Sequence, residues 1–304
     1  MKAFILRPDS SPLSRNIEEY PEGIIIPIDK PYRWTSADVI RKVKFAAIRH
    51  FGKKNLKVGH AGTLDPLATG VLLVCIGKAT KLAETLQSHD KEYIAGITFG
   101  ATTPSYDLEK EIDRFFPHEH ITAEAVESAL PAFIGEQDQI APLFSAKSVD
   151  GVRAYELARK LHKEGKTLDA VAEELIRVSR INITELEMLN FSEAAVSETV
   201  LPPWPQGEGP ATQSWEGSFS KSAASENASA SSRINVTDNS ALGLPRAEVR
   251  MACSKGTYVR AFARDLGEAL GSGAHLDSLQ RSRSGIFRVE NALTVDQAIE
   301  CLKQ

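Results

Sequence analysis

Cysteine is scarce in this chain, which has three, Cys75, Cys253 and Cys301, and no pair spaced as Cys-x-x-Cys. An odd number without that spacing gives neither a disulfide framework nor a zinc site, and it fits a reducing compartment. Long apolar runs are absent as well. The run that precedes Arg7 is four residues long, too short for a signal peptide, and no stretch approaches the ~20 apolar residues that a membrane span needs. We therefore expect a cytoplasmic protein with no membrane contact.

An excess of positive charge is also lacking, because 36 Lys and Arg residues face 40 Asp and Glu residues and the net charge is -4. This balance excludes a uniformly basic nucleic-acid binder. The segment from Lys30 to His60, however, holds nine basic residues and one acid, Asp38, a local balance of +8. A basic run is most often the solvated face of a helix. Because this one leads into a glycine-rich loop, it favours a surface for a polyanion.

The composition that is present, 42% hydrophobic and 25% charged over 304 residues, is that of a globular chain. Apolar runs predict strands over 24–28, 71–76, 93–99 and 247–253, a turn at 29–31 and a last extended piece over 287–293. Helical spacing predicts helices over 122–133 and 258–270, and another between a cap at Thr35 or Ser36 and a stop at Gly52. Strands and helices alternate irregularly, so the predicted fold is a mixed α/β (α+β) sheet flanked by helices.

Residues 201–242 differ from the rest, with nine serines, four prolines, three glycines and little hydrophobic periodicity. This composition predicts a disordered, low-complexity insertion. We expect an N-terminal extension over residues 1–22, followed by one folded domain over residues 23–304 that the insertion interrupts.

The densest group of residues that could do chemistry is KVGHAGTLDPLATGVLLVCIGKATK, from Lys57 to Lys81. Its glycines would let the backbone approach a ligand closely. Asp65 has two interpretations. Asp followed by Pro is typical of a helix start, with Asp as the cap, and a carboxylate fixed by a turn can also act as a nucleophile or a base. His60 taken alone would be an ordinary loop histidine.

A second group, CSKGTYVR from Cys253 to Arg260, follows an expected strand and opens an expected helix. It supplies two cations, Lys255 and Arg260, and an aromatic ring, Tyr258. An arginine beside a catalytic carboxylate would keep that carboxylate charged and orient it by hydrogen bonds. The octapeptide could equally be a basic helix N-terminus.

Together these motifs resemble one family, the bacterial tRNA pseudouridine-55 synthases, which form the TruB-type branch of the pseudouridine synthases. GHAGTLDPLATGVL is similar to the family signature, and DKPYRWTS resembles its DKPxGxTS opening. HDKEY, FSAKSVDGVRAYELAR and GTYVRAFARDLGEALGSGAHLDSLQR follow in the family's order. The similarity covers most of residues 24–298. It implies the pseudouridine synthase catalytic fold, with a mixed, largely antiparallel central sheet, for the domain over residues 23–304.

The resemblance implies that a uridine in the tRNA T-loop is isomerised without cofactor or metal. Asp65 would be the catalytic carboxylate, acting on the ribose, on the base or on a sugar proton. Tyr93 would stack on the flipped base, and Arg260 would pair with the carboxylate. The remaining implied substrate contacts are His60 in the T-loop, Tyr258 and Leu279 in the uracil pocket, and Lys81 and Lys255 as support or backbone contacts. The implied partner is the T-arm of tRNA, with no protein partner and a monomeric enzyme.

The sequence departs from the family pattern at Arg33, where glycine is usual, and at Pro104 in the stretch TTPSYD. The chain ends at Gln304, which predicts that no C-terminal PUA domain follows. Two other functions remain open at this stage. One is a tRNA-binding folding factor without catalysis, and the other is an RNA-guided pseudouridine synthase of the archaeal and eukaryotic type.

Overall fold

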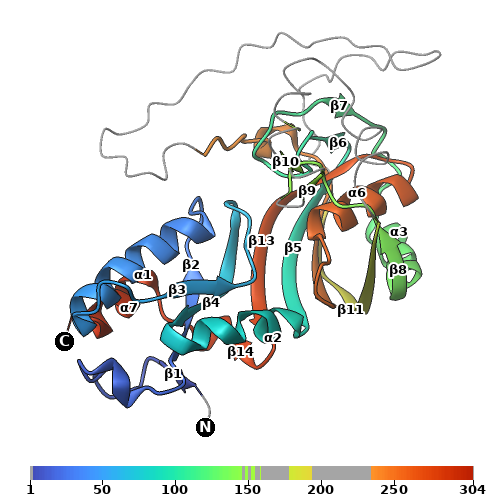
Figure 1. Cartoon of the computed structure of the whole chain (residues 1–304). Coiled ribbons are helices and arrows are strands. Elements are labelled where there is room, and N and C mark those ends of the chain that lie inside the picture. The colour runs from blue at the N-terminus through green and yellow to red at the C-terminus, as the bar shows by residue number, and fades with distance from the viewer. Residues whose placement is uncertain are drawn as a thin grey trace.

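One sheet runs through the molecule in the computed structural model, which describes residues 3–145, 148–149, 152–154, 158, 178–193 and 234–303. Among these residues ten strands join it, in the order β1-β2-β4-β13-β5-β12-β11-β8, with β3 on β4 and β14 on β13 (Figure 1). The pairs β1–β2 and β4–β13 are parallel and the other pairs are antiparallel. The prediction of a mixed, largely antiparallel sheet is confirmed.

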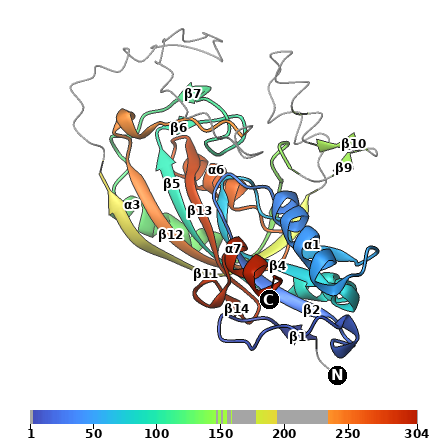
Figure 2. The ribbon, with the colours of Figure 1, turned by 90° about the vertical axis from the view of Figure 1, so that its left-hand side faces the viewer.

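The strands of this sheet have the following bounds: β1 Phe4–Ile5, β2 Ile24–Lys30, β3 Val58–Ala61, β4 Ala68–Ile76, β5 Lys91–Phe99, β8 Gly135–Gln139, β11 Ser179–Ser192, β12 Arg246–Cys253, β13 Ala274–Ser284 and β14 Phe287–Arg288. Two small sheets pair β6 (Ala101–Thr102) with β7 (Arg114–Phe115) and β9 (Ser148–Val149) with β10 (Val152–Arg153). Helices α1 (Ser36–Phe51) and α2 (Ala83–Ser88) pack against β3, and α7 (Val295–Cys301) packs against β2 and α1. Helix α3 (Ala123–Ala129) packs against β11, and α6 (Val259–Ala269) packs mainly against β13 (Figure 2). None of these helices is long and apolar enough to cross a membrane.

Helix α1 forms where the sequence predicts it. Thr35 caps it, because its hydroxyl accepts from Asp38 N–H while the Asp38 carboxylate accepts from Thr35 N–H. The buried face includes Val39, Val43 and Ala47. The helix ends at Gly52, whose φ of 62° is left-handed and favours glycine.

Three local predictions need correction. The turn expected at 29–31 begins later, because β2 continues to Lys30 alongside β4. The helix expected over 122–133 ends at Ala129 and continues as the 3-10 turn Leu130–Phe133, since Pro131 has no N–H to continue an α-helix. The extended piece expected over 287–293 is strand only at Phe287–Arg288 and is followed by the 3-10 turn Val289–Asn291.

Most of the expected insertion, residues 201–233, lies outside the described residues. Its last part, residues 234–242, lies against the folded domain. Thr237 N–H donates to Leu108 O at 2.8 Å, and a short 3-10 turn follows at Ser240–Leu242.

Candidate active site

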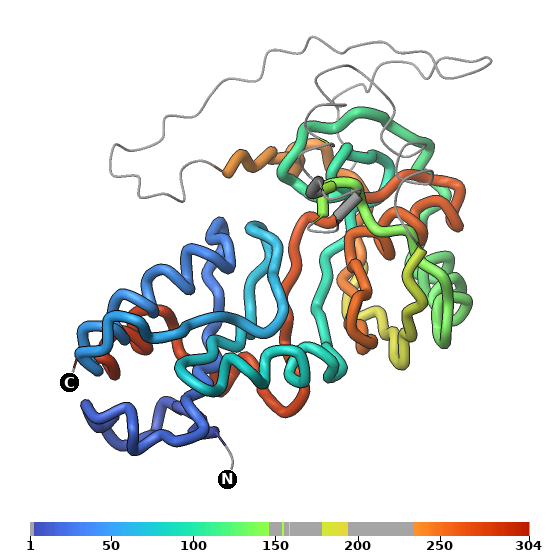
Figure 3. Tube along the Cα trace, viewed as in Figure 1, coloured from blue at the N-terminus to red at the C-terminus, as the bar shows by residue number. Residues whose placement is uncertain are grey.

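Asp65 lies in the connection between β3 and β4, the trace that rises beside α1 in Figure 3. The interpretation of Asp65 as a helix cap is wrong. No helix starts there: Ala68 N–H donates to Asp65 O at 3.1 Å to close a turn, and β4 begins at Ala68. The carboxylate is therefore not used for capping, and its side chain is 38% exposed.

The connection that carries Asp65 is anchored on both sides. Leu64 N–H donates to Ser36 Oγ at 3.0 Å, and that hydroxyl donates to Leu64 O at 3.2 Å. The buried ammonium of Lys30 donates to Pro66 O at 3.1 Å and also to the carbonyl oxygens of Pro31 and Trp34. Burial lowers the pKa of Lys30 to about 8, although the charge of Asp65 opposes that shift. Contacts to β2 and α1 thus fix the backbone on either side of Asp65.

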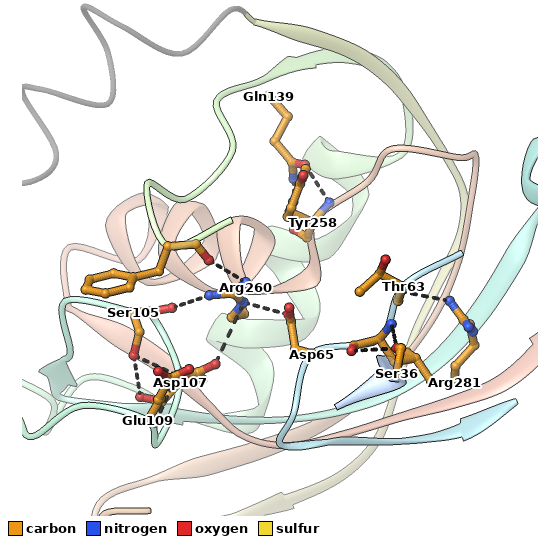
Figure 4. A network of polar contacts seen from close by, with 12 residues as sticks. Ser36, Thr63, Asp65, Ser105, Asp107, Glu109, Gln139, Tyr258, Arg260 and Arg281 are labelled. Atoms are coloured by element: carbon orange, nitrogen blue, oxygen red, sulfur yellow. Dashed lines mark hydrogen bonds and ion pairs between the residues drawn. The ribbon is translucent and has the colours of Figure 1, made fainter. Parts of the chain in front are cut away.

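Arg260, on the first turn of α6, meets Asp65 as the sequence predicts (Figure 4). Its Nε donates to Asp65 Oδ2 at 2.9 Å, while Nη1 donates to Ser105 O at 3.0 Å and Nη2 to Phe144 O at 2.9 Å. The arginine side chain is 5% exposed. A planar guanidinium held at three points can point Nε in only one direction. The structure therefore fixes the carboxylate of Asp65 relative to α6.

A second carboxylate, Asp107, lies behind Arg260 and was not predicted from the sequence. Its Oδ2 is 3.8 Å from Arg260 Nε, and its Oδ1 accepts from Ser105 Oγ at 2.6 Å and from Glu109 N–H at 3.0 Å. Burial raises the pKa of Asp107, an effect that Arg260 opposes. Both Ser105 and Asp107 belong to TTPSYD, the stretch in which Pro104 departs from the family pattern. The stretch nevertheless contributes both residues to the site.

Tyr258 lies two residues before Arg260, immediately before α6 begins, and is held by Gln139, at the end of β8. Tyr258 N–H donates to Gln139 Oε1 at 2.8 Å, and Gln139 Nε2 donates to Tyr258 O at 3.2 Å (Figure 4). No side chain within α6 caps this helix at Tyr258. Gln139, which is 3% exposed, therefore fixes the start of α6 from another element. No motif or predicted element singled out Gln139, which is one of two glutamines in β8.

Tyr93 and Arg281 face each other on neighbouring strands β5 and β13. Tyr93 is 9% exposed, and burial raises its pKa. Arg281 opposes this rise through its charge and through a hydrogen bond. The Arg281 guanidinium donates to Val71 O at 2.7 Å, to Gly62 O at 3.3 Å and to Thr63 O at 3.4 Å. Arg281 thus connects the Tyr93 strand to the connection that carries Asp65.

The other predicted site residues lie at different distances from this centre. Leu279 on β13 pairs with Ala68 and lines one small pocket together with Asp65 and Arg260. His60 is on β3, and burial, assisted by the charge of Arg281, lowers its pKa. Lys81 and Lys255 are exposed, and both lie outside the hydrogen-bonded group of Asp65 and Arg260. Within the described ranges no three His, Cys, Asp or Glu side chains are grouped to hold a metal ion.

The comparisons with known proteins point to one family. The family model described as "TruB family pseudouridylate synthase (N terminal domain)" matches residues 49–200, and "tRNA pseudouridylate synthase B C-terminal domain" matches residues 260–303. The chain is 44% identical over 285 residues to tRNA pseudouridine synthase B of Phocaeicola vulgatus, covering 94% of this chain and 95% of that protein. It is 39% identical to the protein of the same name from Thermus thermophilus, covering 88% and 75%.

Solved structures show the same fold at lower identity. A structure of a Cbf5-Nop10-Gar1 complex matches 98% of this chain with a TM-score of 0.55 and 23% identity. A structure of an H/ACA RNP bound to a substrate RNA containing 2'-deoxyuridine matches 99% with a TM-score of 0.52 and 19% identity. This chain spans 60% and 63% of the length of those two chains.

Proposed function

The chain belongs to the TruB family of pseudouridylate synthases, and from this membership and the site geometry we propose that it converts uridine 55 in the T-loop of tRNA to pseudouridine. The family resemblance drawn from the motifs is confirmed, and with it the class of enzyme, an isomerase of tRNA pseudouridine synthesis. The site within the tRNA and the role of each residue belong to the proposal.

The observation that carries the proposal is the contact between Arg260 and Asp65. In the reaction the C1′–N1 bond of the uridine breaks, the uracil rotates, a C1′–C5 bond forms, and a proton moves from C5 to N1. Asp65 starts this sequence either by attacking C1′ or the base, or by taking a proton from the sugar. All three roles need an ionised and aimed carboxylate, and Arg260 donates to one of its two oxygens and leaves the other for the substrate.

A uridine in a folded T-loop is stacked, so the enzyme must extrude it at a cost of a few kcal/mol. In this proposal Tyr93 supplies an aromatic face for the extruded base. Leu279, which lines the small pocket of Asp65 and Arg260, forms one wall, and Tyr258 forms another. His60 enters the space in the loop that the base leaves. Lys81 and Lys255 contact the RNA backbone. The T-arm is the recognised part of the tRNA, and the enzyme acts as a monomer without a guide RNA.

Mass-spectrometric mapping of T-arm transcripts incubated with the protein tests this proposal. We expect pseudouridine at position 55 with wild-type protein and no added RNA. Asp65→Asn should bind the transcript and lower conversion by ~1000-fold or more. Asp113→Asn, which changes an exposed carboxylate bonded to Thr102, is the matched control and should convert normally.

Wild-type protein that leaves several tRNAs unmodified would refute the proposal. A requirement for a guide RNA would favour the RNA-guided alternative. Asp65→Asn protein that retains the whole cellular function while converting nothing would favour a folding factor.

A further inference from the structure

Helix α1 has an outer face that the catalytic group does not use. Five neighbouring side chains on it are exposed, and they are here called the α1 outer face: Arg41, Lys42, Lys44, Phe45 and Arg49. Four of the five are cations. The opposite side of the helix is buried against the core.

Several basic residues between Lys30 and His60 are buried or already paired, so they are not available to bind RNA. Lys30 is fully buried, and Arg33 turns away to donate to Ile234 O at 2.9 Å. Lys53 pairs with Glu18 at 3.1 Å, and on α1 itself Arg41 pairs with Asp38 at 2.8 Å. Among the residues that the structure describes, no carboxylate forms a salt bridge with Lys42, Lys44 or Arg49. The positive charge of these three residues is therefore available to a partner.

Phe45, at the centre of this face, is 64% exposed. The Arg49 guanidinium lies 5.6 Å from the centre of its ring. Arg41 and Arg49 stand one helical turn before and after Phe45, so cations flank the ring on both sides. A row of cations with an exposed aromatic ring is the combination that proteins use to bind the RNA backbone and stack on bases or sugars.

The α1 outer face begins beside the catalytic carboxylate. The two hydrogen bonds between Ser36 and Leu64 join the first residue of α1 to the residue before Asp65. At ~1.5 Å per residue, Phe45 lies ~14 Å and Arg49 ~20 Å further along the helix axis. In Figure 1 the helix runs away from α6 and from the Asp65 connection. RNA that places a nucleotide at Asp65 would have its neighbouring helical stem within reach of this face.

We propose that the α1 outer face binds the sugar–phosphate backbone of the RNA stem that flanks the modified loop. This inference rests on the proposed function and adds a second contact to it, outside the nucleotides that enter the pocket. Cations of Lys42, Lys44 and Arg49 contact phosphates, and Phe45 contacts the sugars or bases between them. A phosphate contact releases counterions, so it contributes a salt dependence that an aromatic contact does not.

The test compares two triple charge reversals. Lys42→Glu/Lys44→Glu/Arg49→Glu alters the α1 outer face but keeps Arg41, because Arg41 pairs with the capping residue Asp38. Arg7→Glu/Lys78→Glu/Arg288→Glu makes the same change in net charge at three exposed positions. Arg7 follows β1, Lys78 is the second residue of η2 (Gly77–Leu82), and Arg288 lies on β14. In Figure 1 β1 and β14 lie along the lower edge of the molecule, below α1.

We expect the α1 reversal to raise the Kd for a T-arm stem-loop by ~10-fold or more and to lower the slope of log Kd against log salt by about two to three. The control reversal should change both by little. Single-turnover conversion at saturating RNA should stay within about twofold, since α1 touches no reacting atom. Phe45→Ala should raise Kd by ~3-fold or more without changing the slope. A loop oligonucleotide that lacks the stem should bind both reversals alike.

An α1 reversal that binds the stem-loop with unchanged Kd and slope overturns the inference, and so does a control reversal that loses as much affinity. Circular dichroism of each variant identifies loss of folding. Phe45→Ala tests the same surface without changing the net charge. The proposed function fails separately. If wild-type protein makes no pseudouridine but its affinity for the stem-loop still depends on the α1 outer face, the RNA-binding surface is supported and the proposed reaction is refuted.

Discussion

Arg260 Nε and Asp65 Oδ2 are 2.9 Å apart although 195 residues separate them in the chain. The contact joins α6 to the connection between β3 and β4, two elements from opposite halves of the sheet. It makes the position of the carboxylate depend on how the two halves pack.

Arg260→Lys should lower single-turnover conversion by ~100-fold or more. A lysine keeps the charge but cannot donate at fixed angles to Asp65, Ser105 O and Phe144 O together. Arg264→Lys is the matched control on the same helix, where the arginine bonds Asp265 and Ile140 O. An equal loss in both variants would show that the effect comes from α6 as a whole.

Asp107→Asn should lower conversion by ~10-fold with little change in RNA affinity. The buried carboxylate balances part of the Arg260 charge, and without it Arg260 would bind Asp65 more strongly and make it a weaker nucleophile or base. Single-turnover rates beside Kd values separate the two effects. A conversion rate equal to that of Asp113→Asn would refute a role for Asp107.

Gln139→Glu should lower the conversion rate by about 10-fold. The Kd for RNA should rise by a smaller factor. The glutamate keeps the size of the side chain but loses the Nε2 donor to Tyr258 O, which leaves two acceptors facing each other. Gln137→Glu is the control, since Gln137 lies on the same strand β8 and its Nε2 donates to Phe133 O and not to the start of α6. If Gln139 acts through Arg260, the losses from Gln139→Glu and Arg260→Lys should be less than additive in the double variant.

Gly70→Ala should lower the free energy of unfolding by about 3 kcal/mol or more. Gly70 has a φ of 95°, and a Cβ there would lie 2.3 Å from Arg281 O, across the β4–β13 pair. Gly59→Ala is the matched control in β3, because φ there is ordinary and a Cβ would meet nothing within 4 Å. Urea unfolding of the two variants measures the difference, and equal stabilities would contradict the close approach.

The free energy of unfolding should rise with pH above about 8. Burial lowers the pKa values of Lys30 and Lys91 from 10.5 to about 8 in the folded protein. Between those values the unfolded chain holds protons that the folded chain has released, so stability rises by up to ~1.4 kcal/mol per pH unit for each lysine. As pH falls through about 8, both states become protonated and this contribution is lost.

Urea unfolding at pH 7.5 and 9.5 checks this prediction. Lys30→Met and Lys91→Met should each show a smaller rise than wild type, while Lys44→Met, at an exposed position of α1, should show the full rise. A rise of equal size in all four proteins would mean that other groups cause it.

Arg33 shows how a departure in the sequence becomes understandable in the structure. The resemblance places glycine at this position, and the backbone of Arg33 has a φ of 62°, which favours glycine. The position therefore keeps the left-handed turn between β2 and α1 with a residue that strains it. The Arg33 guanidinium donates a hydrogen bond to Ile234 O, in the last part of the expected insertion, a contact that glycine could not make.

Strand β13 could not be predicted from the sequence, although it lies in the centre of the sheet between β4 and β5. Its residues AHLDSLQRSRS carry no apolar alternation, because Arg281 is buried by bonds to carbonyl oxygens and Asp277 faces Arg246 in an ion pair. Hydrophobic periodicity detects strands that are buried by apolar packing. It does not detect a strand whose buried residues are polar and paired by hydrogen bonds.

The sequence by itself determined helix α1, the buried strand β4 and, through its motifs, the family and the pair of Asp65 and Arg260. These depend on spacing within short segments or on residue order, which a chain carries without folding. Only the tertiary structure decided that Asp107 and Gln139 belong to the site and that β13 lies between β4 and β5. Gln139 bonds a residue 119 positions away, and such a contact follows from strand order and packing, which no local pattern contains.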